Sequence, residues 1–215
     1  MLARVSARVI SVNVGRPAQL SVRRGRPLMS AIGKAPVEGR VRVEGVNLAG
    51  DDQADRRVHG GPDKAVYAYA SEETDAWEAE LHRDLGPAPF GENLTTEGID
   101  VSGALVGERW RIGTTLLEVV QPRLPCFKLG LRIGDPGFLK RFVRASRPGA
   151  YLRIVEEGEL GAGDAIEVDL ERLPDHGVTV RHIFDAVLLD ESLIPHVLGA
   201  PELLPSLREL LTSRT

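Results

Sequence analysis

The sequence is poor in cysteine: Cys126 is the only one among 215 residues. A single cysteine cannot form a disulfide within the chain, and it cannot supply the several thiolates of a cysteine-ligated zinc or iron–sulfur site. If the protein carries out electron-transfer chemistry, its electrons must therefore come from another protein or from a diffusible reductant.

An excess of positive charge and long apolar runs are also lacking. Lys and Arg number 27 against 31 Asp and Glu, which gives a net charge of −4, so no general affinity for nucleic acid or for an anionic membrane is predicted. No apolar run approaches membrane-spanning length, and the first residues lack the pattern of a signal peptide. We therefore expect a cytosolic protein with no nucleic-acid or membrane partner.

The overall composition is that of an ordinary globular protein, with 42% hydrophobic and 27% charged residues. The length allows one domain with an appendage, or two small domains. Alternating apolar residues predict strands over 4–14 with an irregularity near Ile10, over 41–43 and 65–69, in a pair within 105–123 joined near Gly113, and over 150–155 answered by 165–168. Helical spacing predicts helices from 71 to about 85, from 138, and from 180, 192 and 201. Strands thus fill most of the chain to about residue 172, and three short helices follow.

The only cysteine lies in the segment Gln-Pro-Arg-Leu-Pro-Cys-Phe-Lys-Leu, residues 121–129. Two prolines favour an extended, rigid backbone that presents Cys126. Arg123 and Lys128 would favour the thiolate, the form that acts as nucleophile or soft metal ligand, wherever their side chains approach the sulfur. The alternative is that Cys126 is a small apolar core residue.

A second motif, His-Gly-Gly-Pro-Asp-Lys, covers residues 59–64. Paired glycines allow the backbone to approach a ligand and to form an anion nest, which His59 and Lys64 would complete as a phosphate clamp. The alternative is a tight turn in which both side chains are solvated.

Four further places carry candidate site residues. The polar stretch 90–98 would bring Glu92 and Asn93 to the mouth of a site, unless it is a loop in which Asn93 satisfies its own backbone. Gln121 lies at the end of a predicted strand, a common location for site residues. Arg153 faces either solvent or a polar cavity, and Lys34 by itself reads as a surface lysine.

Taken together, residues 59–64, 90–94 and 121–129 resemble, in order, the motifs of the MOSC domain, named after the C-terminal domain of molybdenum cofactor sulfurases. The helical tail that opens at residues 178–180 is similar to that of the bacterial YiiM-like branch. The resemblance implies an α+β, mainly β fold, with a MOSC barrel domain over 1–172, peripheral helices, and a three-helix segment over 178–215.

The resemblance also implies a function: binding of the molybdenum cofactor, with Cys126 as metal ligand and catalytic residue. The cations that would hold the cofactor phosphate are Lys34, His59, Lys64 and Arg123. The residues that would contact the pterin or line the substrate pocket are Glu92, Asn93, Gln121 and Arg153. The implied reaction removes oxygen from N-hydroxylated compounds, such as N-hydroxylaminopurine-type bases, with electrons from a separate flavoprotein or iron–sulfur protein. The cofactor carries the hard chemistry in such a scheme, and the protein supplies a ligand, orientation and access.

Two other functions stay open at this point. In the first, the protein is a carrier in which Cys126 transfers sulfur or cofactor between enzymes without turnover. In the second, it is a cysteine hydrolase or transferase with Cys126 as nucleophile, His59 as base, and Asn93 or an aspartate as the orienting group.

Overall fold

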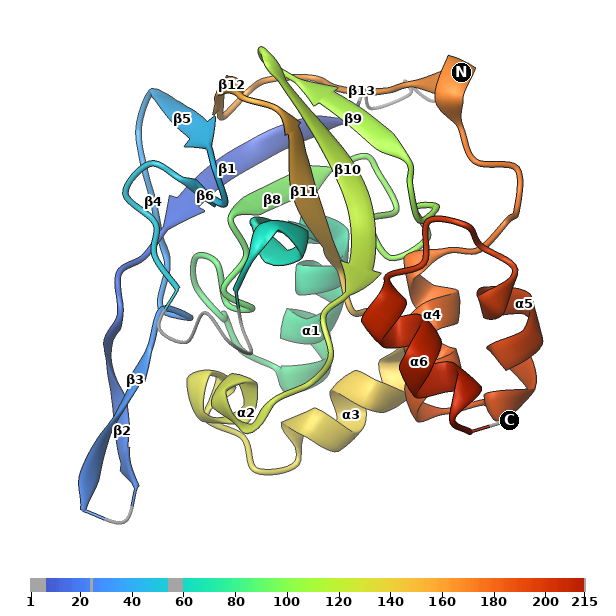
Figure 1. Cartoon of the computed structure of the whole chain (residues 1–215). Helices are drawn as coiled ribbons and strands as arrows, with labels where there is room; N and C mark the ends of the chain where they lie inside the picture. The colour runs from blue at the N-terminus through green and yellow to red at the C-terminus, as the bar shows by residue number, and fades with distance from the viewer. Residues whose placement is uncertain (1–6, 24, 54–59, 215) are drawn as a thin grey trace.

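The computed structural model describes residues 7–23, 25–53 and 60–214. In these ranges the strands are β1 (Arg8–Val14), β2 (Ala18–Arg23), β3 (Arg26–Ser30), β4 (Ala35–Pro36), β5 (Arg40–Glu44), β6 (Asn47–Leu48), β7 (Val66–Ala70), β8 (Leu94–Glu97), β9 (Arg109–Ile112), β10 (Thr115–Pro122), β11 (Ala150–Glu156), β12 (Gly158–Gly161) and β13 (Ile166–Val168). The α-helices are α1 (Ser71–Leu81), α2 (Phe127–Ile133), α3 (Phe138–Ala145), α4 (Val180–Leu188), α5 (Ile194–Leu198) and α6 (Pro205–Thr212) (Figure 1). No helix in the described part of the chain is long and apolar enough to cross a membrane.

The main sheet has the strand order β13-β9-β10-β11-β7-β8-β1-β4 (Figure 1). Neighbouring strands are antiparallel except β7 and β8, which are parallel. Backbone bonds also join β1 to the residues that lead into β13: Val9 donates to the Asp164 carbonyl at 2.9 Å, and Ile166 donates to the Ala7 carbonyl at 2.8 Å. These bonds bring β1 to the opposite edge of the sheet, so that the strands curl around a common core. The predicted α+β, mainly β fold is confirmed.

The irregularity predicted near Ile10 is confirmed as a β-bulge. Val9 pairs with Thr96 and Ser11 pairs with Thr95, which leaves Ile10 as the extra residue. A bulge adds one residue to a strand and shifts the alternation of the side chains beyond it. Val9 and Val12 therefore both point into the core, although they are three residues apart, while Ile10 is 40% exposed.

Strand β10 joins the barrel to the helical tail. Successive side chains of a strand point to opposite faces, so Val119 packs into the barrel core and Val120 into the core of the tail. Helix α4 lies against the outer face of β10, which explains why this strand is buried along nearly its whole length. The three tail helices are confirmed; the division into domains at 1–172 and 178–215 stays a prediction.

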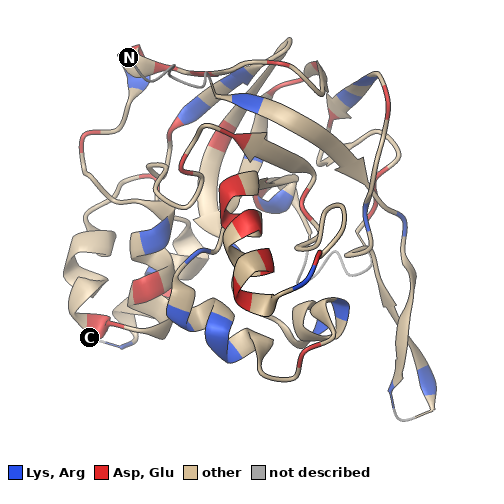
Figure 2. Cartoon of the chain, turned by 180° about the vertical axis from the view of Figure 1, so that it is seen from behind, with Lys and Arg blue, Asp and Glu red and all other residues tan. Residues whose placement is uncertain are grey.

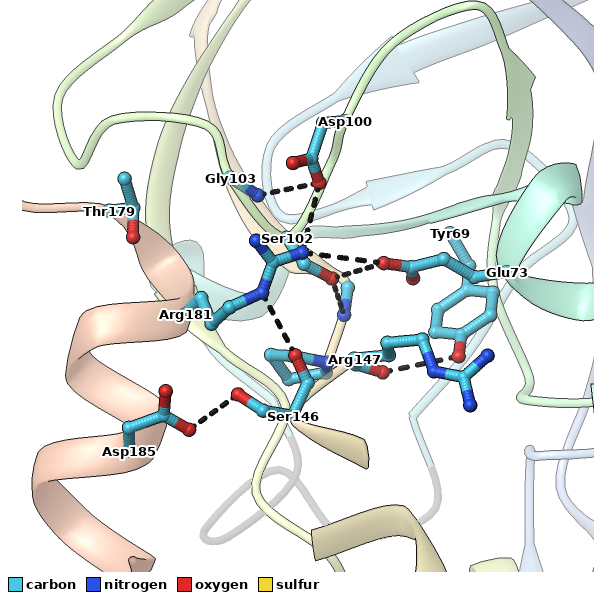
Figure 3. Close-up of polar contacts among 12 residues, drawn as sticks. Tyr69, Glu73, Asp100, Ser102, Gly103, Ser146, Arg147, Thr179, Arg181 and Asp185 are labelled. Carbon is cyan, nitrogen blue, oxygen red and sulfur yellow. Dashed lines mark hydrogen bonds and ion pairs between the residues drawn. The ribbon is translucent and has the colours of Figure 1, made fainter. Parts of the chain in front are cut away.

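Polar contacts fasten α4 to the barrel beside this apolar contact (Figure 3). The Arg181 side chain donates to the Ser146 carbonyl at 3.0 Å and to the Asp100 carboxylate at 3.2 Å. Ser102 donates to the Glu73 carboxylate at 2.8 Å, and Ser146 donates to the Asp185 carboxylate. The tail is therefore held by hydrogen bonds to the segments that contain Asp100 and Ser146.

We expect Arg181→Met to weaken this attachment, because methionine keeps most of the apolar stem and loses every donor. The side chain is 37% exposed, so the loss in unfolding free energy should be only about 1–2 kcal/mol. Urea unfolding followed by tryptophan fluorescence measures it, with the exposed Arg42→Met as matched control. An Arg181 variant as stable as the Arg42 variant would contradict this role.

Several predicted boundaries and pairings are wrong. Helix α1 ends at Leu81, short of residue 85, because His82 takes a left-handed conformation with φ of 53°. Helix α6 begins at Pro205 and not at residue 201. Residues 165–168 do not pair with β11. Strand β13 pairs with β9, and an unpredicted strand, β12, pairs with β5. The β2–β3 hairpin and helix α2 were also not predicted, because neither has a clear apolar period.

Candidate functional site

Cys126 lies where β10 leads into α2. It is the N-cap residue of α2, with an extended backbone at φ −131° and ψ 156°, and its side chain is half-buried. Pro122 and Pro125 restrict the connection between strand and helix, so the thiol has a fixed position. The predicted extended presentation of Cys126 is confirmed, although a helix starts at the next residue.

Arg123 places a buried cation against this thiol. Arg123 is only 7% exposed, its guanidinium donates a hydrogen bond to the Phe90 carbonyl, and its charge interacts with Cys126 in the same pocket. The guanidinium carbon also lies 5.1 Å from the ring centroid of Tyr67. The contacts with Phe90 and Tyr67 hold the guanidinium in the pocket that Cys126 also lines. Its effect on the thiol stays a prediction.

Lys34 is not a surface lysine, because it forms a buried ion pair with Asp51. Nζ of Lys34 lies 2.5 Å from Oδ1 of Asp51, and the two side chains are 8% and 3% exposed. Burial lowers the pKa of Lys34, against the opposing effect of the Asp51 charge. The backbone amide of Gly15 donates to the same carboxylate at 2.8 Å. Sequence reasoning missed Asp51, since nothing in a polar stretch links one aspartate to a lysine 17 residues earlier.

Asn93 connects two strands, β7 and β1, with Asp51. Its side-chain oxygen accepts from the Tyr67 amide at 3.1 Å, and its nitrogen donates to the Asn13 carbonyl at 3.1 Å and to Asp51 at 2.9 Å. Asn93 thus satisfies the backbone of β7 and β1 and not its own. This wall of the pocket is held rigid by a fully bonded amide.

Two side chains from neighbouring strands contact the turn at residues 60–64. Gln121 donates to the Asp63 carbonyl at 3.0 Å, and Arg153 lies 3.0 Å from the Asp63 carboxylate. Lys64, which ends this turn, lines the pocket, and burial lowers its pKa. His59 lies outside the described residues. A direct contact of Gln121 or Arg153 with a cofactor stays a prediction.

Glu92 is completely buried, and it belongs to the lining of a separate hollow, with Ser11 and Asn13, and not to that of the main pocket. Its carboxylate accepts from the Phe90 amide at 3.1 Å and from the Thr95 hydroxyl at 3.2 Å. Burial raises its pKa from the ordinary value of 4.5 to about 7, although these hydrogen bonds oppose the shift. Glu92 thus shapes the bend around Gly91, a residue that lines the main pocket. A contact of Glu92 with a cofactor stays a prediction.

We expect Glu92→Gln to flatten the dependence of stability on pH. The folded protein keeps the Glu92 proton up to about pH 7, whereas the unfolded chain releases it near 4.5. The folded state therefore binds more protons in this window, and its stability falls as pH rises, by roughly 3 kcal/mol from this group. Unfolding free energies at about pH 5 and pH 7.5 measure the slope. The exposed Glu38→Gln variant is the control, and an unchanged slope in Glu92→Gln would contradict the assignment.

The main pocket collects these groups. Its lining includes the cations Lys34, Lys64, Arg123 and Lys128, the acids Asp51 and Asp52, the rings of Tyr67 and Tyr151, and Cys126. No histidine is part of this lining among the described residues. His59, the predicted base of the cysteine hydrolase, lies outside them, so that alternative stays a prediction. The described residues also contain no group of three His, Cys, Asp or Glu side chains arranged for a metal.

The fold and the pocket define a small barrel protein in which one thiol and several buried cations face the same space. Comparison with known proteins is consistent with this description. The MOSC domain profile matches residues 55–167. The chain belongs to the MOSC domain family, as the sequence motifs predicted.

Individual relatives extend the match. The chain is 37% identical to the uncharacterized protein YflK of Bacillus subtilis and 35% identical to protein YiiM of Escherichia coli, each over 160 residues; these cover 74% and 73% of this chain and 72% and 69% of the relatives. It is 36% identical over 155 residues to a reductase of Gibberella moniliformis, which is 69% of this chain but 27% of that protein. The crystal structure of YiiM from Geobacillus stearothermophilus superposes with a TM-score of 0.77 at 26% identity, covering 97% of this chain and 98% of that one. Family membership and the likeness to a reductase indicate an enzyme.

Proposed function

We propose that this protein binds the molybdenum cofactor through Cys126 and reduces N-hydroxylated compounds, such as N-hydroxylaminopurine-type bases, in the cytosol. The observation that carries the proposal is the pocket that Cys126 shares with the buried Arg123 and with three lysines. The similarity to a reductase supports it.

The described residues fit this cofactor. Cys126 supplies one soft thiolate, a ligand type that suits redox-active transition metals. Lys34, Lys64 and Arg123 line the pocket and would hold the anionic phosphate. Burial lowers the pKa of Lys34 and Lys64, and a bound anion would favour their charged forms. The cofactor's phosphate would therefore offset the free-energy cost of burying these two lysines in their charged forms.

The reaction takes two electrons and two protons: R–NHOH + 2e⁻ + 2H⁺ gives R–NH₂ + H₂O. The bound cofactor supplies two-electron chemistry at the N–O bond. The chain's own residues orient and enclose the reactants: Arg123 fixes the sulfur, while Tyr67 and Tyr151 form an aromatic wall with ring centroids 5.0 Å apart. With its only cysteine used as a ligand, the chain has no cluster of its own, so a separate flavoprotein or iron–sulfur protein must supply the electrons.

The test is the molybdenum and pterin content of the protein purified from a host that makes the cofactor, beside the same protein from a host that cannot. We expect near-stoichiometric molybdenum and pterin in the first preparation only, and turnover of an N-hydroxylated base driven by a reduced viologen dye. The matching base without the N–O bond is the substrate control. Bound cofactor without turnover would favour the carrier, and absence of both molybdenum and pterin would overturn the proposal.

A further inference from the structure

An exposed apolar surface lies on α2 and the segment before it, beside the β2–β3 hairpin. We call it the hairpin–α2 face: its apolar centre consists of Leu124, Phe127 and Leu131, which are between 38% and 45% exposed, and Arg23 of the hairpin lies over Phe127. Three large apolar side chains close together along the chain differ from the single exposed residues that any protein surface carries.

This face borders the pocket of Cys126. The β2–β3 hairpin projects from the body of the protein next to α2 (Figure 1), and the two elements are in contact. The Arg23 guanidinium lies 5.0 Å from the ring centroid of Phe127, the residue that follows Cys126. Ser30 at the end of β3 and Lys128 on α2 both line the pocket. A molecule seated on the hairpin–α2 face would thus lie beside the reactive thiol.

The charge of this region is of one sign, although the whole chain has a net charge of −4. The exposed cations include Arg23 and Arg26 on the hairpin and Arg132 on α2, and the sequence has no Asp or Glu within residues 16–34 or 121–134. Seen from behind, the hairpin carries blue segments near its tip and no red one (Figure 2). Among the described residues no carboxylate forms an ion pair with Arg23, Arg26 or Lys128.

We propose that the hairpin–α2 face is the docking surface for the protein that delivers electrons, and that this partner presents an acidic surface around an apolar centre. The inference rests on the proposed function, which requires an external donor. A cationic rim steers an acidic partner and an apolar centre stabilises the encounter, the combination expected of a small, transient interface.

Other occupants fit the face less well. A second copy of the chain in a two-fold interface would place the same cations opposite each other, and like charges across an interface are repulsive. Single-stranded nucleic acid is bound by several stacked aromatic side chains, whereas Phe127 is the only aromatic residue of the hairpin–α2 face.

The experiment titrates an acidic flavodoxin, as a probe, against the cofactor-loaded protein at about 0.01 M and about 1 M ionic strength. Arg23→Glu/Arg26→Glu is compared with Arg42→Glu/Arg172→Glu, a control of equal net charge. Arg42 is exposed on β5, at the end of the molecule away from the hairpin (Figure 1). We expect at least tenfold weaker binding at low salt for the hairpin variant only, and little difference at high salt. Leu131→Ser should weaken binding at both salt concentrations.

Viologen-driven turnover separates the two proposals. Unchanged viologen turnover with slower flavodoxin-driven turnover in the hairpin variant supports the docking surface. Equal binding by the hairpin and control variants overturns it, even where viologen turnover upholds the proposed reaction. Concentration-dependent self-association of the wild type that the hairpin substitutions abolish would reassign the face to a second copy, and binding of single-stranded DNA lost in the same variant would reassign it to nucleic acid. Absence of viologen-driven turnover in the wild type would overturn the proposed function, whereas the binding result would not be affected.

Discussion

Cys126→Ser is expected to lose molybdenum and to lower reductive turnover by at least about a hundredfold. Substitution of groups that only support a metal ligand costs about 10- to 100-fold in affinity or activity, and removal of the ligand itself should cost no less. Serine replaces a soft thiolate by a hard hydroxyl of similar size, which redox-active transition metals bind less well. Metal analysis and turnover driven by a reduced viologen measure both losses.

The Cys126→Ser substitution should not destabilise the fold, so a loss of molybdenum would not result from unfolding. Cys126 is the N-cap residue of α2, without a capping hydrogen bond from its side chain. Serine is among the preferred N-cap residues, so Cys126→Ser should unfold at the same temperature as the wild type or slightly above it. Arg132→Gln, on the exposed side of α2, controls for changes in this helix that leave the thiol intact. Full metal content and turnover in Cys126→Ser would contradict the ligand assignment.

Asp51→Ala is expected to lower the unfolding free energy by about 3–5 kcal/mol, the range for breaking a buried ion pair by removing one partner. The loss leaves Lys34 buried without its counter-charge. It also leaves the Gly15 amide and the Asn93 side-chain nitrogen without an acceptor that they now share. Urea unfolding of the protein without cofactor measures the change.

Lys34→Met is the informative comparison for Asp51. It removes the other half of the pair, but Asp51 keeps the two donors from Gly15 and Asn93, and the methionine fills most of the lysine's volume. We therefore expect a smaller loss, about 1–3 kcal/mol. If Lys34→Met costs as much as Asp51→Ala, then the ion pair itself, and not the convergence of donors on Asp51, stabilises this corner of the pocket.

The sequence predicted the parts of the site that depend on neighbours along the chain. Pro122 and Pro125 act on the adjacent backbone, so the extended presentation of Cys126 was readable from six residues. Val9 and Val12 are three residues apart, which departs from the period of two in a strand and indicated the irregularity near Ile10. The three tail helices followed from helical spacing in the same way, although proline positions misplaced the start of α6.

Burial and long-range pairing were decided by the tertiary structure alone. Lys34 reads as a surface residue until the fold brings Asp51 within 2.5 Å, and Asn93 reads as a loop residue until β7 and β1 are placed on either side of it. The raised pKa of Glu92 likewise arises from complete desolvation, which no stretch of sequence displays. The sequence by itself therefore determined the family, several of the strands and the extended backbone that presents Cys126. The tertiary structure determined which polar groups share the low-dielectric interior, because the strength of their interactions depends on distances between residues far apart in the chain.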